Sequence, residues 1–357
     1  MKPLLTSLLI LSILMVLPQC KKPKGYLEFT DFPVTVELIH QPIHLTNAIK
    51  YPSGFVFLDS ALVVLDLNGD FLLGFFSLVD FAFMYHAIRR GSGPSEEESI
   101  FFIENAINDN EFWYKTPFGI KTMRYHPNSG QLNYLKKIPN CNSFAGVSFL
   151  LGDELLGISR QIQSKEFVKI SLVDCEVVDF GADFPEVGKR LSLEEKNKFF
   201  STKSIATKQD GTRFATSYHD FPIIRVFDTQ KGFLLADIRF KTNQIFPDAK
   251  YDPYAKIEEA MRVTTNYFVS KGTNQLIYSS YSGKSPIELQ PNIIQEGFKI
   301  TDFTNEIHVF DWNGNPVKRI ILDQYIFSFG VSPDDKTLVA ISMSEPEVLL
   351  KYDLNGN

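Results

Sequence analysis

The residues best suited to bind a ligand lie in one loop, residues 86–98, where two Arg precede two Gly and three Glu follow. The candidate binding residues of this loop are Arg89, Arg90, Gly91, Gly93 and Glu96. A guanidinium group donates fork-shaped pairs of hydrogen bonds to carboxylates and similar acceptors. One hypothesis is therefore that the two Arg bind an acidic or hydroxyl-rich ligand near the central channel of the molecule. The alternative is a rigid connection between two structural repeats, in which Ser95 and Glu98 cap a helical turn.

Two further positions are weaker candidates for binding. His219 and Asp220 are adjacent, and Tyr281 lies at the matching position of the next repeat. We expect all three in loops between the second and third strands of their repeats. The sequence contains no Gly-x-Ser-x-Gly, no His-Glu-x-x-His, no phosphate-binding Gly-rich loop followed by Lys and no Cys-x-x-Cys. We therefore predict no catalytic residues from motifs.

No metal or other cofactor is predicted either. Asp66, Asn68 and Asp70 imitate the first half of a calcium loop, but Phe71 takes the place of the required Gly and Ser77 that of the Glu. We interpret the Asp side chains at such positions as acceptors that stabilise hairpin turns.

The elements that must position these residues are short antiparallel strands. Asn-Gly pairs follow an Asp in residues 66–70, 311–315 and 353–357, each behind an apolar run. Asn-Gly accepts the positive φ angles of a tight hairpin turn. Three copies of this pattern indicate a repeated β-module.

One repeat is especially clear and runs from Lys203 to Phe240. Strands are predicted at 204–207, 213–218, 223–228 and 233–240, with Asp-Gly and Lys-Gly in two of the turns. Four antiparallel strands in about 40 residues make one blade of a β-propeller. The third strands of successive blades are expected to end near six residues: Asp66, Tyr125, Asp174, Asp228, Asp311 and Asp353.

The fold class predicted is therefore all-β, a six-bladed β-propeller of four-stranded antiparallel blades. The last repeat lacks a fourth strand, whereas Val34–Ile39 alternates like a strand that belongs to no other repeat. We expect it to pair with Val348–Asp353, complete the last blade and close the ring. Closure would remove the exposed sheet edges that cause aggregation. We interpret the 32 Phe and 14 Tyr as packing between blades.

The predicted organisation is a signal peptide at 1–19, a lipidated Cys20 with its tether at 20–33 and one propeller domain at 34–357. The apolar run of residues 4–17 has the length of a signal-peptide core, and Leu17-Pro-Gln-Cys20 resembles the box at which bacterial lipoproteins are cleaved and lipidated. Insertions with short helices are expected near 192–200 and 252–262, from a capping-box pattern and from Asp252-Pro253.

The net charge limits the classes of partner that we expect, and the cysteine content bears on the redox state of the compartment. The net charge is −6 and no basic stripe interrupts it, so nucleic acid is not an expected partner. Besides Cys20, only Cys141 and Cys175 are present. They could form a disulfide in an oxidising compartment or remain small buried apolar residues, and the sequence leaves both readings open.

Residues 66–72 and 90–97 together are similar to the TolB-like six-bladed β-propeller lipoproteins of Bacteroidetes, in which an Asp-x-x-Gly hairpin precedes a Gly-x-Gly-Pro-x-Glu loop. Two features depart from that pattern: the insertion before Arg90 is long, and Ser95 stands where Gly is usual. The resemblance implies a propeller fold, an address at the cell envelope and a binding role with no reaction attached.

These observations lead to one expected function and one alternative. The first is a non-enzymatic binding propeller, anchored by lipid in the outer membrane facing the periplasm or the cell surface, whose partner is a protein or an envelope or glycan ligand. Its contact with the membrane would be through the lipid alone. The alternative is a propeller hydrolase or lyase with a site at the central channel and a possible calcium ion.

Overall fold

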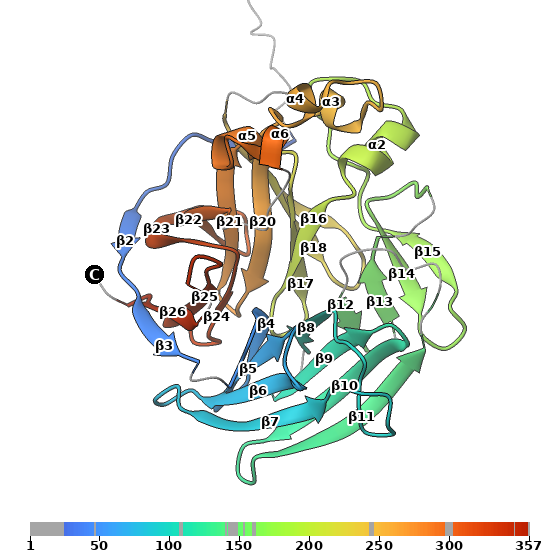
Figure 1. Ribbon diagram of the computed structural model, residues 1–357. Helices are drawn as coiled ribbons and strands as arrows, with labels where there is room; N and C mark the ends of the chain where they lie inside the picture. Colours follow the sequence, from blue (N-terminus) through green and yellow to red (C-terminus); the bar gives the residue numbers. More distant parts are fainter. Residues whose placement is uncertain are drawn as a thin grey trace, which may run out of the picture.

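The computed structural model describes residues 25–45, 48–106, 110–139, 141, 149–152, 154–158, 162–242, 246–296, 303–345 and 347–355. The predicted signal peptide and Cys20 lie outside these residues. Six sheets of four or five strands are arranged in a ring (Figure 1). The predicted six-bladed β-propeller is confirmed.

In each blade the strands follow one another from the channel to the rim. Blade 1 contains β4 (Pro52–Phe57), β5 (Ala61–Asp66), β6 (Phe71–Ser77) and β7 (Phe83–Arg89). Blade 2 contains β8 (Phe102–Asn105), β9 (Glu111–Thr116), β10 (Gly119–His126) and β11 (Gln131–Pro139). Blade 3 contains β12 (Phe149–Leu151), β13 (Glu154–Gly157), β14 (Phe167–Ser171) and β15 (Val177–Phe180).

The second half of the ring repeats this order. Blade 4 contains β16 (Lys203–Thr207), β17 (Arg213–Tyr218), β18 (Ile223–Asp228) and β19 (Leu234–Phe240). Blade 5 contains β20 (Thr265–Gly272), β21 (Leu276–Lys284), β22 (Thr304–Asp311) and β23 (Pro316–Ile326). Blade 6 contains β24 (Ser328–Val331), β25 (Thr337–Ile341) and β26 (Val348–Asp353), and its outermost strand is β3 (Gln41–His44).

An N-terminal strand closes the ring, but the strand differs from the one predicted. β3 pairs antiparallel with β26, so that Gln41–His44 completes blade 6. The predicted closing segment, Val34–Ile39, instead contains β2 (Thr35–Leu38), which pairs parallel with β23 as a fifth strand of blade 5. The prediction that Val34–Ile39 pairs with Val348–Asp353 was therefore wrong: the closing strand is the next one along the chain, Gln41–His44.

A third N-terminal strand, β1 (Leu27–Phe29), pairs parallel with β19 as a fifth strand of blade 4. We call residues 27–44 the N-terminal belt, because β1, β2 and β3 run along the outer edges of blades 4, 5 and 6 in turn. Phe29 holds the belt in place with ring contacts to Phe240 and Phe310 at 5.0 and 5.6 Å. The belt therefore fastens three blades to one another.

Aromatic rings fill the space between neighbouring blades, as predicted from the composition. At the interface of blades 3 and 4, the ring of Phe167 lies 5.2 Å from that of Phe214 and 5.3 Å from that of Phe227. All three side chains are fully buried. Packed sheets lie about 10 Å apart, a gap that such rings span.

Asp side chains hold the hairpin turns, which confirms the role that we assigned to them. The carboxylate of Asp66 accepts hydrogen bonds from the backbone N–H groups of Lys50, Tyr51, Asn68 and Gly69 at 2.7–3.0 Å. Contrary to the prediction, Asp66 ends the second strand of its blade and not the third.

The described helices are all short and gather at one end of the ring (Figure 1). α2 (Leu193–Phe199) has the capping box expected near 192–200, with Ser192 as N-cap and Glu195 as its partner. The helix expected near 252–262 is two separate turns, α3 (Asp248–Tyr251) and α4 (Ile257–Ala260), and Asp252 is the C-cap of α3 and not an N-cap. Two more turns follow: α5 (Pro286–Leu289) and α6 (Ile293–Glu296).

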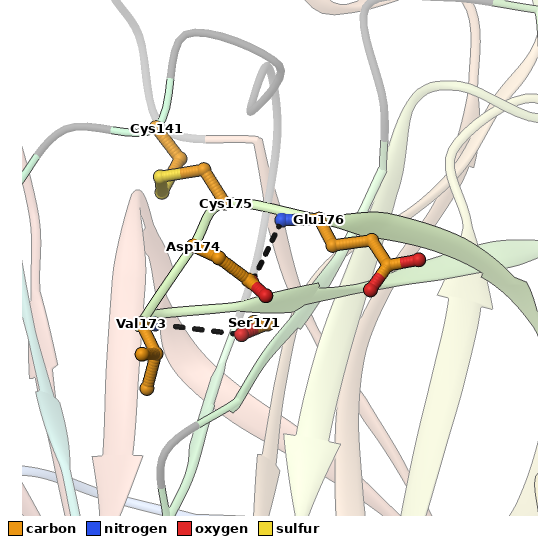
Figure 2. Close-up of a disulfide and its surroundings, with 6 residues drawn as sticks. All are labelled: Cys141, Ser171, Val173, Asp174, Cys175 and Glu176. Carbon is orange, nitrogen blue, oxygen red and sulfur yellow. Dashed lines mark hydrogen bonds between the residues drawn. A yellow bond between two sulfur atoms is a disulfide. The ribbon is translucent and has the colours of Figure 1, made fainter.

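Cys141 and Cys175 form a disulfide, which decides the question that the sequence left open (Figure 2). The bond joins the end of blade 2 to the turn between β14 and β15 in blade 3. Cys175 has a φ of 60° in this turn, whereas the corresponding turn of blade 4 has Gly232 with a φ of 70°. Cys175 thus takes the left-handed position that Gly usually occupies.

Among the described residues, no helix has the length and apolar character that a bilayer crossing requires.

Candidate functional site

The central channel contains two adjacent cavities, which share several lining residues. The larger, of about 320 Å³, is lined by the first parts of β4, β8, β16 and β24, by Val269–Lys271 of β20, and by Phe101 before β8. The smaller, of about 80 Å³, is lined by the ends of the same strands and includes Asn105 and Gln209. In the strands that line both cavities, the larger cavity uses residues nearer the start of the strand than the smaller one does. The larger cavity therefore lies nearer the end of the ring at which these strands begin, where α2 precedes β16 and α3 and α4 precede β20.

An ion pair lies between the two cavities. The ammonium group of Lys271 on β20 is 2.8 and 2.9 Å from the two carboxylate oxygens of Glu104 on β8. Both residues line both cavities. Blades 2 and 5 are opposite each other in a six-bladed ring, so this pair spans the channel. Glu104 is the only carboxylate among the described residues that line the cavities.

The wall beside Lys271 is held by a buried hydroxyl network. The hydroxyl of Ser270 lies 2.7 Å from that of Ser217 and 2.8 Å from that of Ser279. The backbones of β16 and β20 also approach closely, because a Cβ at Gly272 would lie 2.3 Å from the carbonyl oxygen of Thr207. These contacts fix the position of the strand that carries Lys271.

The loop of Arg89, Arg90, Gly91, Gly93 and Glu96 connects the outermost strand of blade 1 to the innermost strand of blade 2. None of these residues lines either cavity. The guanidinium group of Arg90 donates to the carbonyl oxygens of Gly69, Leu67 and Glu98 at 2.9, 2.7 and 3.1 Å. Arg90 therefore braces two turns, which fits the rigid-connection alternative.

The two glycines of this loop make room for Glu96. A Cβ at Gly91 would lie 2.0 Å from a carboxylate oxygen of Glu96, and the N–H of Gly93 donates to the same oxygen at 3.0 Å. Arg89 is more available, since its side chain is 69% exposed and lies 3.8 Å from Glu96. Ligand binding by this loop stays a prediction.

His219 and Asp220 lie in the expected loop between the second and third strands of blade 4. Asp220 is buried and accepts hydrogen bonds from His219 at 3.0 Å, from Lys250 at 2.6 Å and from the hydroxyl of Tyr251. Burial alone would raise the pKa of Asp220, but the bonds from His219, Lys250 and Tyr251 hold this pKa below its usual value. The cluster fastens α3 to blade 4.

Tyr281 is not in a loop, contrary to the prediction. It lies within β21, is buried, and stacks on the imidazole of His308 with ring centroids 4.4 Å apart. His308 in turn contacts the hydroxyl of Tyr267 at 3.1 Å and Glu306 at 2.7 Å. Burial lowers the pKa of His308 despite the adjacent Glu306. Tyr281 is part of an internal polar cluster. Phe32 of the belt covers this cluster, with its ring centroid 4.5 Å from that of His308.

The residues that sequence reasoning missed are Glu104 and Lys271. They are 167 positions apart, so no local motif joins them. The innermost strands of blades 2 and 5 were not predicted individually, so the sequence reasoning had no signal for either charged residue. The described residues contain no group of three or more His, Cys, Asp or Glu that could hold a metal ion.

Comparison with known proteins agrees with the fold. Residues 265–334, which cover blade 5 and the start of blade 6, match the family described as TolB-like 6-blade propeller-like. The predicted resemblance is thus confirmed for the fold and, over these residues, for the sequence. No curated protein matches the chain.

Two solved structures from Bacteroides are similar to this chain. A member of the DUF4221 family from Bacteroides vulgatus has 10% identity and a TM-score of 0.57, over 88% of this chain and 97% of its own. A protein described as exported, from Bacteroides fragilis, has 14% identity and a TM-score of 0.55, over 89% and 98%. At these identities the similarity concerns the fold alone.

Proposed function

We propose that this chain is a non-enzymatic binding protein of the bacterial cell envelope, which presents the helix-bearing end of its ring to a partner. The observation that carries the proposal is the gathering of α2 to α6 at that end (Figure 1). Ring closure does not require these insertions, because blades 1, 2 and 6 have no described helix. The insertions therefore build a surface beyond what the fold needs.

The helices form a connected surface rather than separate loops. Lys189, just before α2, contacts Asp248 of α3 at 2.7 Å, and the backbone N–H of Ile287 in α5 donates to the carbonyl of Met261, the C-cap of α4, at 3.2 Å. Fixed connections of this kind keep a binding surface pre-organised, which lowers the entropic cost of association.

A protein is the partner that the exposed side chains favour. Tyr254 is 94% exposed, and Ile257 and Leu193 are also exposed on the same group of helices. Large apolar side chains supply much of the energy of protein interfaces, with Tyr over-represented. A glycan or other envelope ligand is the second possible partner, and nucleic acid is not expected.

Site-specific photo-crosslinking in the native host tests this proposal. A photoreactive amino acid at position 254 is expected to form a covalent adduct with one predominant protein, identified by mass spectrometry. Val79 is the matched control, because it is 92% exposed but lies in blade 1, across the ring from blade 4. Equal adducts from both positions, or none from 254, would overturn the proposal. Loss of glycan-array binding in Tyr254→Ser would identify a glycan instead.

Anchoring by a lipid on Cys20 is the second part of the proposal. The protein from Bacteroides fragilis is described as exported, which supports an envelope address. The ring of Tyr26 lies 3.8 Å from the guanidinium group of Arg239 on blade 4. Six residue steps from Cys20 to Tyr26 span at most about 20 Å, so the lipid would hold this blade near the membrane.

Mass spectrometry of protein extracted from membranes tests the anchor. The mature chain is expected to begin at a lipid-modified Cys20, and Cys20→Ser is expected to move the protein to the soluble fraction. A soluble mature chain that begins at another residue would contradict this part without affecting the partner experiment.

A further inference from the structure

We propose that the larger channel cavity binds a small zwitterion with an apolar body, of the chemical class of free aromatic or branched α-amino acids, through Glu104 and Lys271. None of the residues that line this cavity belongs to a helix, and the inference does not rest on the proposed function.

The ion pair is accessible to a small molecule. The side chains of Lys271 and Glu104 are 21% and 40% exposed, although they meet in the middle of the channel. Each extends from an innermost strand toward the opposite blade, and each borders the cavity of about 320 Å³. This volume lies at the lower end of the range for small-molecule sites, which is about 300–1,000 Å³. It is suited to one small molecule and not to a glycan chain.

The charges decide the class of ligand. A ligand that carries only a carboxylate would separate Lys271 from Glu104 and leave the latter unpaired in a confined space, which is costly. A zwitterion supplies a partner for both residues: its carboxylate accepts from Lys271 and its ammonium group donates to Glu104. An α-amino acid has both groups on one carbon, so it can insert into the pair and leave no charge unmatched.

The walls of the cavity decide the rest of the ligand. Phe101 and Val269 give it accessible apolar surface, whereas Phe329 and Ile103 also border it but are buried. Phe101 is 56% exposed, so its ring has free surface at the cavity. An apolar ligand side chain would therefore lie against the exposed ring of Phe101.

Calorimetric titration of the wild-type protein with four probes tests the class of ligand. L-Phenylalanine and L-leucine are expected to bind and to raise the melting temperature. Phenylalaninamide lacks the carboxylate and N-acetylphenylalanine lacks the ammonium group. Each is expected to bind at least about tenfold more weakly, because it loses one of the two charge-assisted hydrogen bonds.

Variants then test the location. Glu104→Gln is expected to weaken binding of L-phenylalanine at least about tenfold. The matched control is Glu154→Gln, which breaks the ion pair of Glu154 with Lys169 on blade 3, where the charged atoms are also 2.9 Å apart. This control is expected to leave the affinity unchanged. The exchange Glu104→Lys with Lys271→Glu keeps a pair in place and is expected to restore binding relative to Glu104→Gln.

Several outcomes would overturn the proposal. If neither amino acid binds, or if the amide and the acetylated compound bind as well as L-phenylalanine, the pair is only a brace between blades 2 and 5. If Glu104→Gln fails to fold, as judged by circular dichroism, the four-probe series on the wild-type protein decides alone.

Discussion

Asp66 illustrates how one side chain organises the residues around it. It is buried and its carboxylate accepts four backbone N–H groups, two from its own turn and two from Lys50 and Tyr51 before β4. A Cβ at Gly69 would lie 2.5 Å from the same carboxylate, so the close approach requires Gly there. In the pattern Asp-x-Asn-Gly, the Gly is therefore needed for the close approach of the Asp carboxylate as well as for the turn.

Replacing Asp66 by Asn should destabilise the protein by about 2 kcal/mol, because the amide cannot accept all four bonds and hydrogen bonds to charged groups contribute about 1.5–3 kcal/mol each. Asp353→Asn is the control, since Asp353 is exposed and accepts from Asn355 at the end of the described chain. Urea unfolding measures both losses. Equal losses would show that the four bonds to Asp66 add nothing.

The pKa of Tyr281 indicates how the stability of the protein changes at high pH. Burial, followed by the nearby charge of Glu306, raises its pKa to about 12 from 10.0. A folded-state pKa above the unfolded value contributes stability that is complete below pH 10 and is lost as the pH rises toward 12. Tyr114 and Tyr278 are shifted in the same direction, mainly by burial.

The free energy of unfolding should therefore fall between pH 10 and about 12, and tyrosinate absorbance should appear together with unfolding. Tyr281→Phe should lose less stability over this range than the wild-type protein. Complete tyrosinate formation in a protein that is still folded near pH 10 would contradict the expectation.

At the scale of elements, the N-terminal belt is the least regular part of the fold. Its strands join three different blades, two in parallel and one antiparallel. Alternate residues of β1 have opposite environments: Phe29 is buried against rings of blades 4 and 5, whereas Leu27 is 48% exposed. Substitutions at Phe29 and Leu27 therefore compare the loss of a buried side chain with the loss of an exposed one in the same strand.

Phe29→Ala is expected to destabilise the protein by about 3 kcal/mol, as is usual when a buried Phe is truncated. Leu27→Ala should cost less than about 0.5 kcal/mol, because exposed substitutions rarely exceed this. Both are measured by denaturant unfolding, with the m-value as a check that the change lies in the folded state. Similar losses for the two variants would show that Phe29 does not anchor the belt.

The strands of blade 4 were predictable from sequence because Gly211 and Gly232 mark two turns and the apolar runs between turns are short. The closing strand was not, for a physical reason. Pro42 lowers the strand character of Gln41–His44, yet Pro is tolerated on an outermost strand, where its missing N–H would face solvent. Val34–Ile39 alternates convincingly, but alternation indicates a strand and not its partner.

The candidate site was less predictable than the fold. His219 and Asp220 were placed correctly in their loop because the strands around them were predicted correctly. The assignment of Tyr281 to a loop was wrong, because β21 extends to Lys284. Glu104 and Lys271 meet only because the ring brings blades 2 and 5 across the channel from each other. Contacts of this kind depend on the closed geometry, which no local pattern contains.

At the scale of the whole molecule, the disulfide links two blades that the belt does not reach. Cys141 and Cys175 are 34 positions apart in the sequence. Cross-linking a loop of this length stabilises a protein by about 3–4 kcal/mol if the effect is mainly on the unfolded chain. Blades 2 and 3 are thus joined covalently, and blades 4 to 6 by added strands.

Reduction should lower the free energy of unfolding by about 3–4 kcal/mol, measured in urea with and without a reductant. The double variant Cys141→Ser, Cys175→Ser should unfold like the reduced protein and should not respond to the reductant. An oxidised protein no more stable than the double variant would contradict the expectation.

The belt also has a consequence for the order of assembly. A ribosome makes residues 27–44 first, but their partners are β19, β23 and β26, the last of which ends at Asp353. β1 must therefore wait, unpaired, until Phe240 has been synthesised, β2 until Ile326 and β3 until Asp353. Contacts of such long sequence separation form slowly, and a waiting strand is a target for mispairing. A helper protein that shields the nascent N-terminus would have the most to offer during this interval.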